Sequence, residues 1–365
     1  MHDAGDTVRG MNTRRDILKA FTAAGSAAAF TVPGWGQATA PHTRDWDWLT
    51  GNWDVWHKRL KERLAGSDDW AEFAGKSSFW HTLGGLGNVD DNLLYLPGGE
   101  YRGLSIRAFD PVTNNWSIWW IDGRQSGKLD PPVVGGFKND EGVFYGKDTF
   151  KGIPITVRFR WHEVRSQRPH WDQAFSKDGG KTWEINWRNY FTRTNTQATI
   201  QPARDVPGVP ERDDWNFLAG AWQVRNRRLA KRLVGSKQWE EFPSTLRNWP
   251  VLGGFGNVGD NVFNAASGTY KGKSVRTYDE TARIWRSWWL DGRDPANITP
   301  SLSGRFENGV GLLTGDDIQD GKPVKVRSRW SDITATSAHW EQAMSADGGA
   351  TWETNWVADL TRTAT

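Results

Sequence analysis

The sequence predicts an all-β protein made of two antiparallel β-barrels in tandem. The first observation is an internal repeat. The stretch SKDGGKTWEINW at 176–187 recurs as SADGGATWETNW at 345–356, and a shift of 169 residues aligns 46–194 with 215–363 without a gap. The second is the alternation of apolar and polar residues in short segments separated by turn residues, which is typical of strands. A single large propeller or a sandwich is the competing fold.

Each repeat divides into short extended segments. In the first repeat we expect a long strand after Gly51, a strand ending near Trp80, and further strands at 101–110, 116–122, 142–148, 155–161, 170–175 and 183–192. Pairs such as Asn114-Asn115 and Asp178-Gly179 form the turns between them. This spacing predicts eight to ten strands per repeat. Segment 83–92 is glycine-rich and is expected to be a loop, and because it opens no helix it does not indicate a phosphate-binding loop.

Four regions follow from the repeat. We expect a targeting segment at 1–40, the first barrel at 41–195, a proline-containing linker at 196–212 and the second barrel at 213–365.

The first forty residues have the features of a twin-arginine signal peptide. Arg14 and Arg15 precede an apolar, alanine-rich run at 20–32, and Ala-Thr-Ala at 38–40 offers a cleavage site. The apolar run is too short for a stable membrane-spanning helix. We therefore expect a periplasmic or secreted protein without a membrane span.

Composition narrows the class of partner. The chain carries a formal charge of +3 and no basic block, so it is not expected to bind nucleic acid. It has no cysteine, so stability must come from packed cores. Its 25 tryptophans indicate either unusually aromatic packing or walls for a ring-bearing ligand or a sugar.

The repeated hairpin resembles the Asp-box of sialidases and other propeller proteins. That resemblance implies a turn element rather than a catalytic one. Two boxes 169 residues apart do not match the blade spacing of a propeller, which is roughly 40–50 residues.

The two ends of each repeat resemble the calycin signature, found in lipocalins, fatty-acid-binding proteins and nitrobindins. Gly51-x-Trp53 opens the first repeat and Arg193 closes it, and Gly220-x-Trp222 with Arg362 repeats the arrangement. The resemblance implies an arginine stacked on the tryptophan at the barrel floor. The repeats also look like an uncharacterised bacterial domain family near the calycins. No motif places a haem-ligating histidine, so haem is a speculation and the cofactor remains unknown.

In the segment 101–109, the residues on one face are the same or similar in the two repeats, whereas those on the other face differ. Tyr101, Gly103, Ser105, Arg107 and Phe109 correspond to Tyr270, Gly272, Ser274, Arg276 and Tyr278. A mixed polar and aromatic face is typical of a ligand-holding barrel interior. Ser105 and Arg107 are therefore candidate ligand-binding residues, with Trp119 and Trp120 as walls. Arg107 needs a partner: a protein carboxylate, with Glu72 or Glu184 favoured by type, or the ligand itself.

Further ligand-binding candidates come from three strands. They are Arg158, Arg160, Trp171, Gln173, Glu184 and Asn186. If Ser176 faces Trp183 across the hairpin, Gln173 pairs with Asn186 and shares a face with Trp171, whereas Trp187 lies with His170. The alternative interpretation of the two arginines is a solvated stripe or an ion pair, and that of Glu184 is a partner for one of them.

Histidines are the candidate catalytic bases, and His170 and His81 are the two considered. A hydrogen-bonded structural role is the alternative for His170. His57, His81 and His162 have no histidine counterpart in the second repeat, which favours the first as the seat of any chemistry. No ligand spacing indicates a metal site.

These observations leave three functional hypotheses. The first is an exported binding protein for a small apolar or aromatic ligand, with or without an acidic group, inside a tryptophan-rich barrel. The second is a periplasmic lyase, isomerase or hydrolase with a histidine base, and the third is carbohydrate binding through tryptophan. Ligand identity and oligomeric state are left open.

Overall fold

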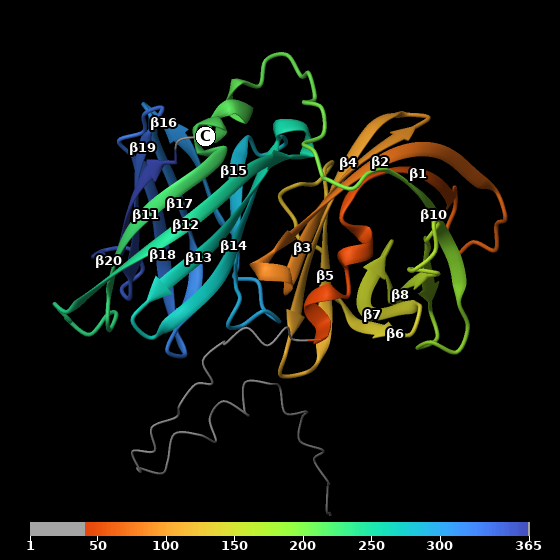
Figure 1. The fold of residues 1–365 in the computed structure, drawn as a ribbon, viewed down its shortest axis with the longest axis horizontal. Helices are drawn as coiled ribbons and strands as arrows, with labels where there is room; N and C mark the ends of the chain where they lie inside the picture. Colours follow the sequence, from red (N-terminus) through yellow and green to blue (C-terminus); the bar gives the residue numbers. More distant parts are fainter. Residues whose placement is uncertain (1–40, 364–365) are drawn as a thin grey trace, which may run out of the picture. The chain divides into compact units, whose positions relative to one another are not determined.

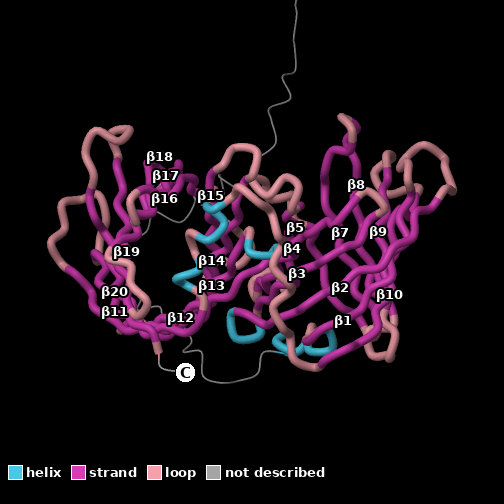
Figure 2. The backbone as a smooth tube through the Cα atoms, turned by 90° about the horizontal axis from the view of Figure 1, so that it is seen from above, coloured by secondary structure: helices cyan, strands magenta, loops and turns pink. Residues whose placement is uncertain are grey.

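The protein, described over residues 41–363 by a computed structural model, consists of two closed, ten-stranded antiparallel barrels that follow one another along the chain (Figure 1). Figure 2 shows the strands of the second half arranged around a ring. The predicted fold class is therefore confirmed. The predicted targeting segment at 1–40 lies outside the described residues, and the predicted domain boundaries stay predictions.

Barrel 1 is formed by β1 to β10. The strands are β1 (Gly51–Leu60), β2 (Trp70–Thr82), β3 (Gly87–Leu96), β4 (Gly99–Asp110), β5 (Asn115–Asp122), β6 (Val133–Lys138), β7 (Glu141–Phe150), β8 (Ile153–His162), β9 (His170–Ser176) and β10 (Glu184–Asn195). Each strand pairs with the next, and β1 also pairs with β10 to close the barrel. Three 3₁₀ turns accompany them: η2 (Pro41–Arg44), η3 (Asp47–Leu49) and η4 (Leu83–Gly85).

Barrel 2 repeats this order with β11 to β20. The strands are β11 (Gly220–Leu229), β12 (Trp239–Val251), β13 (Gly256–Ala265), β14 (Gly268–Asp279), β15 (Ile284–Asp291), β16 (Leu302–Glu307), β17 (Val310–Gln319), β18 (Lys322–Ser331), β19 (Ser337–Ser345) and β20 (Glu353–Arg362). The 3₁₀ turns are η5 (Pro210–Asp213), η6 (Asn216–Leu218) and η7 (Leu252–Gly254). Within the described residues no helix is long and apolar enough to cross a membrane.

Two strands of barrel 1 differ from the expectation. The predicted loop 83–92 is only the turn η4 followed by β3, because Val89 is buried and extends the sheet. Strand β6 was not predicted, since it contains Gly135 and Gly136. A Cβ at Gly135 would lie 2.0 Å from the carbonyl oxygen of Val143 on β7, so the close strand approach there requires glycine despite its low strand propensity.

Both barrel floors have the geometry that the calycin resemblance implies. The guanidinium of Arg193 lies 4.1 Å from the ring centroid of Trp53 and donates to the carbonyl oxygens of Trp48 and Thr50. Arg362 lies 4.2 Å from Trp222 and binds the equivalent carbonyls. One guanidinium thus covers the indole and satisfies carbonyl groups at a strand entrance.

The repeated Asp-box is a turn element, as its sequence resemblance implies. Asp178 Oδ1 accepts hydrogen bonds from the backbone N–H of Lys181 and of Thr182, and Ser176 Oγ accepts one from Gly180 N–H. Hydrogen bonds from Thr182 hold the pKa of Asp178 well below its usual range. All these contacts are internal to the hairpin, so the motif stabilises the turn.

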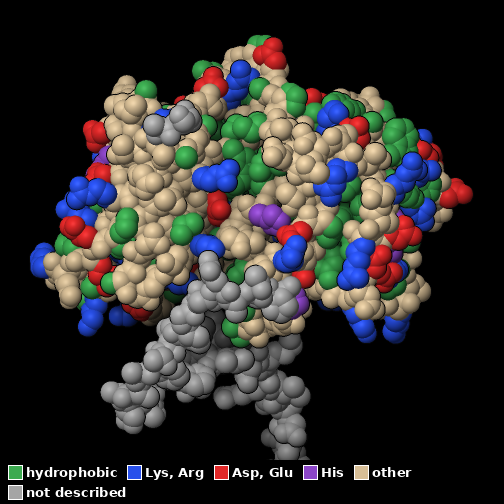
Figure 3. Space-filling model, viewed as in Figure 1, with side chains coloured by type: hydrophobic (Ala, Val, Ile, Leu, Met, Phe, Trp, Pro, Cys, Tyr) green, Lys and Arg blue, Asp and Glu red, His purple; other side chains and the backbone are tan. Residues whose placement is uncertain are grey.

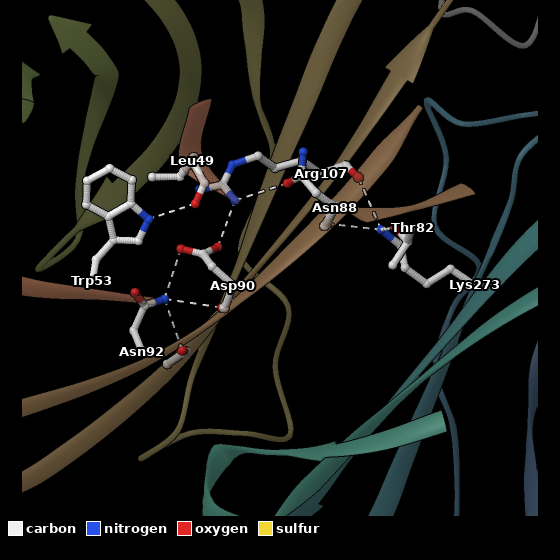
Figure 4. Close-up of polar contacts among 9 residues, drawn as sticks. Leu49, Trp53, Thr82, Asn88, Asp90, Asn92, Arg107 and Lys273 are labelled. Atoms are coloured by element: carbon white, nitrogen blue, oxygen red, sulfur yellow. Dashed lines mark hydrogen bonds and ion pairs between the residues drawn. The ribbon is translucent and has the colours of Figure 1, made fainter. Parts of the chain in front are cut away.

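The barrels contact each other through β3, β4 and η4 on one side and β13, β14 and η7 on the other. The contacts are reciprocal, because Asp91 Oδ1 accepts from Leu252 N–H at 3.0 Å and Asp260 Oδ1 accepts from Leu83 N–H at 2.9 Å. Lys273 breaks the symmetry: it is fully buried and its Nζ lies 3.1 Å from the Arg107 carbonyl oxygen (Figure 4). Its counterpart in the first repeat is Leu104, so the face of 101–109 that differs between the repeats is the face that packs on the other barrel.

On the face drawn in Figure 3, basic and acidic side chains are interspersed over the surface. This face therefore carries no extended field of one sign.

We predict that Asp91 makes stability depend on pH. Burial raises the pKa of Asp91 to about 7, well above its value in an unfolded chain, so the folded state binds the extra proton between these values. Relative to Asp91→Asn, which keeps the acceptor for Leu252, the wild type should lose stability as pH rises from about 4 to 7, by about 2–4 kcal/mol, and then level off. Urea unfolding across pH 4–8 measures this.

Asp260→Asn is the matched control for that experiment. Burial also raises the pKa of Asp260, the reciprocal residue, but the hydrogen bond from Leu83 N–H and the charge of Lys273 oppose that rise, so its pH-dependent loss should be smaller. Parallel pH profiles for wild type and Asp91→Asn would contradict the prediction.

Candidate functional site

The candidate site is a cavity of about 350 Å³ inside barrel 2. Its volume lies in the range of small-molecule sites. Five tryptophans are among its lining residues: Trp288, Trp289, Trp330, Trp340 and Trp356. Polar side chains from several strands complete the wall, including Asn226, Ser244, Asn261, Ser274, Arg276, Ser328 and Gln342. A mostly apolar wall with a few polar groups is the usual composition of a ligand site.

Substitutions between the repeats explain why barrel 2 is hollow at this place. Four phenylalanines of barrel 1 are replaced by smaller or more flexible residues at the positions 169 further on: Phe150, Phe159, Phe175 and Phe191 become Gln319, Ser328, Met344 and Leu360. In barrel 1 these rings pack closely, with Phe150 and Phe175 at 5.5 Å and Phe159 and Trp171 at 5.0 Å between centroids. Some lining positions gain volume, as where Ser77 becomes Leu246 and Leu94 becomes Phe263, but the loss of ring volume at four positions leaves space.

Barrel 1 keeps its buried arginine paired within the protein. Arg107 Nη1 donates to Asp90 Oδ1 at 2.7 Å and to Asn88 Oδ1 at 3.2 Å (Figure 4). The ring of Trp46 stacks 4.6 Å from the guanidinium. The partner is therefore an internal carboxylate on the neighbouring strand β3, and the prediction of Glu72 or Glu184 was wrong because residue type alone does not specify register.

Both of those glutamates act on the outside or at the rim of barrel 1. Glu72 pairs with Lys58 at 2.8 Å. Glu184 Oε1 accepts from the backbone N–H of Leu64, which has a left-handed φ of 59°. Glu353 binds Leu233 in the same way in barrel 2. Glu184 therefore fixes a strained loop, and neither of its two predicted roles, in ligand binding or as a partner of an arginine, accounts for this contact.

Barrel 2 has the equivalent arginine but lacks the carboxylate. The position of Asp90 is occupied by Gly259. Arg276 Nη1 donates to Asn257 Oδ1 at 3.0 Å and to Ser274 Oγ at 3.3 Å, and its guanidinium lies 4.3 Å from the Trp215 ring. Among residues 41–363 no carboxylate lies within ion-pair distance of it. Burial lowers the pKa of Arg276 to about 9, so it is still charged at neutral pH.

The mouth of the cavity carries three more arginines. Arg228 lies 3.3 Å from Glu240, and Arg293 lies 2.6 Å from Asp291. Burial, together with repulsion from Arg228, lowers the pKa of Arg232. The three line the cavity and a depression of about 510 Å³ at its mouth, where the carboxylates of Glu240 and Asp320 lie beside them.

The other predicted residues on the central strands of barrel 1 are divided between two environments. Ser105 and Trp120 lie on the face of Arg107, and Trp120 packs with Tyr101. Trp119 belongs instead to the apolar cluster that contains residues of both barrels. The counterparts of Ser105, Arg107, Trp119 and Trp120 are Ser274, Arg276, Trp288 and Trp289. All four line the cavity of barrel 2.

Arg158 and Arg160 lie on the outer face of β8. They alternate with Val157, Phe159 and Trp161, which belong to or pack against the core of barrel 1. Arg158 stacks 4.5 Å from Trp183 and Arg160 lies 3.5 Å from Glu141. This geometry agrees with the surface ion-pair alternative rather than with a site inside the barrel.

A β-bulge changes the predicted pairing on β9 and β10. The register shifts between Ile185 and Trp187, so Gln173 pairs with Trp187 rather than with Asn186. Trp187 therefore packs with Trp171, at 6.1 Å between centroids, and not on the His170 face as predicted. Gln173 still donates to Asn186 Oδ1 at 2.8 Å. In barrel 2, the buried Oε1 of the cavity residue Gln342 has no partner among the described residues.

The histidines lie apart from the cavity. His170 stacks on His162 at 4.5 Å, and His162 Nε2 lies 2.6 Å from Asp172 Oδ2. His81 Nε2 lies 2.8 Å from Thr50 Oγ1, and burial lowers its pKa. Desolvation and the charge of His162 lower the pKa of His170. In the described part of the chain, no group of three or more His, Asp or Glu is arranged to hold a metal ion.

Sequence reasoning named Arg276 only as the counterpart of Arg107, and it overlooked Gly259 and the hollow of barrel 2. The signal was present in the two repeats, at the positions where they differ: a lost carboxylate and four lost rings. The three histidines without a counterpart in the second repeat pointed to the first repeat instead.

Comparison with known proteins gives distant similarities. No family model matches the chain, and no curated protein matches it. Among solved structures it is similar to an S-type phycobiliprotein lyase from Guillardia theta, with 12% identity over 41% of this chain and 91% of the other and a TM-score of 0.30. A protein of the DUF3598 family from Nostoc punctiforme shares 11% identity over 88% and 99%, with a TM-score of 0.28. Overlaps this low identify no function for the chain.

We predict opposite stability effects for one substitution at the two equivalent arginines. Arg107→Met strands the buried carboxylate of Asp90 and should cost roughly 3–5 kcal/mol of unfolding free energy. Arg276→Met removes an uncompensated buried charge and leaves only neutral partners, so stability should be kept or increased. Chemical denaturation of both variants measures this. Equal losses would show that Arg276 is also paired internally.

Proposed function

We propose that this chain is a binding protein for a small apolar or aromatic ligand, held in the cavity of barrel 2. The observation that carries this proposal is the cavity of about 350 Å³ with five tryptophans in its wall, at the place where phenylalanines fill barrel 1. Indole rings offer large flat contact areas and lose little conformational entropy when a ring-bearing ligand stacks on them.

The position of the tryptophans favours this function over carbohydrate binding. Binding of sugar at a surface needs a row of exposed rings, whereas these five line a space inside a barrel. Trp56 and Trp239 are exposed, and they belong to different barrels.

The chemistry of the lining favours binding over catalysis. Neither His170 nor His81 belongs to the cavity wall, and the position of His57 is Asn226 in barrel 2. Asp291 lines the cavity but is paired with Arg293. Asp317 is the other carboxylate of the lining, on the mouth side of β17. A general base has to reach the reacting proton, and the deep part of this cavity offers amides, hydroxyls and Arg276.

The proposal also includes export of the protein from the cytoplasm. The twin-arginine signature and the cleavage site at 38–40 support secretion of a folded binding protein, and a periplasmic or extracellular location follows.

Filling the cavity with the residues of barrel 1 should abolish binding. Native mass spectrometry of the purified protein, incubated with a metabolite extract, should show a bound small molecule on the wild type. Ser328→Phe with Met344→Phe, which copies Phe159 and Phe175, should remove it because the rings occupy the space. Met344→Phe alone is the milder variant and should weaken binding.

Near-ultraviolet circular dichroism controls for the fold of both variants. A ligand that stays bound to the folded double variant would place binding elsewhere and contradict the proposed function. A wild type that binds nothing from the extract would also count against it.

A further inference from the structure

We infer that the ligand of barrel 2 is an organic carboxylate whose charged group pairs with Arg276 near the floor of the cavity. This inference rests on the proposed function and specifies the class of ligand. It begins from the comparison of one strand pair in the two barrels: Asp90 and Arg107 in barrel 1, Gly259 and Arg276 in barrel 2.

Arg276 is buried as deeply as a paired charge would be. Its side chain is 8% exposed, yet its partners are neutral: Asn257, Ser274 and the rings of Trp215 and Trp330. Cation–π contacts offset part of the desolvation cost of a guanidinium, and an anion would offset much more.

Arg276 has unused donors of the kind that a carboxylate binds. A guanidinium carries five N–H donors, and in the described part of the chain only Nη1 of Arg276 makes hydrogen bonds. The Nε and Nη2 edge is left, and this is an edge that a planar carboxylate binds with both oxygens.

A phosphate is a poorer fit than a carboxylate. It brings up to about two negative charges, and Arg276 is the only cationic side chain of the lining that lies away from the mouth. The remaining lining arginines, Arg228, Arg232 and Arg293, lie at the mouth, and Arg228 and Arg293 are already paired with carboxylates there.

Gly259 stands where barrel 1 has the carboxylate of Asp90, and its surroundings leave little room for a side chain. A Cβ there would lie 2.6 Å from Ser274 Oγ and 3.1 Å from Leu246 Cδ1, so an acidic side chain fits only if these two side chains shift. Barrel 1 has more room at this place, since Ser77 stands where barrel 2 has Leu246.

Matched acid and amide probes test the inference. Isothermal titration at pH 7 with benzoate and benzamide, and with 2-naphthoate and 2-naphthamide, separates charge from shape. The wild type should bind an acid about 10- to 100-fold more tightly than its amide, the range for a charge-assisted hydrogen bond. Arg276→Met should remove this preference and leave amide affinity within about threefold.

A second variant keeps Arg276 and supplies the missing carboxylate. Gly259→Asp with Leu246→Ser copies barrel 1 and should reduce acid affinity about 10-fold or more, while Leu246→Ser alone should keep the preference for acid. Arg327→Met, which changes an arginine stacked on Trp352 outside the cavity lining, is the control and should bind like the wild type.

The outcomes separate the two proposals. Equal affinity for acid and amide in the wild type, or an unchanged acid preference in Arg276→Met, overturns the carboxylate inference and leaves the proposed function standing. Failure of the wild type to bind any of the four probes counts against the proposed function as well.

Discussion

A buried guanidinium near the floor of each barrel is the constraint on which the rest of the structure depends. Water is excluded there, so the charge must be compensated by a carboxylate, by neutral dipoles and rings, or by a ligand. Barrel 1 uses Asp90, one strand away, at 2.7 Å. Barrel 2 has only the second kind of compensation: Arg276 has amide, hydroxyl and indole partners but no carboxylate within the described residues. The two halves of one duplication thus differ in whether the charge is already neutralised.

Packing follows the same division. Where the charge is neutralised, phenylalanine rings such as Phe159 and Phe175 fill the barrel, and where it is not, Ser328 and Met344 leave a cavity. Both changes act in one direction, because each makes barrel 2 more able to accept an anionic, ring-bearing molecule. Barrel 1 is thus the filled half of the protein, and barrel 2 is the half that contains the cavity.

The interface between the barrels shows a third consequence of duplication. Asp91 and Asp260 make reciprocal hydrogen bonds to Leu252 and Leu83, as two copies of one surface do when they pack on each other. Lys273 interrupts this symmetry, and its Nζ reaches the carbonyl oxygen of Arg107, so the backbone of the paired arginine in barrel 1 is held by barrel 2. Two identical faces would place Leu104 and its counterpart in the same environment, and the sequence drift on this face removes that identity.

The sequence by itself determined the all-β class, the duplication, the tandem barrels and the stacked arginine at each floor. The first three depend on local periodicity, turn chemistry and a long repeat, all of which are visible along the chain, whereas the stacked arginine is what the calycin resemblance implied. Only the tertiary structure decided the partner of Arg107, the face of Trp187 and the seat of the cavity. Cross-strand register and a single bulge decide which side chains meet, and neither can be derived from residue type. The emptiness of barrel 2 is the sum of several small volume losses on strands far apart in sequence, and those losses become one cavity only when the barrel closes.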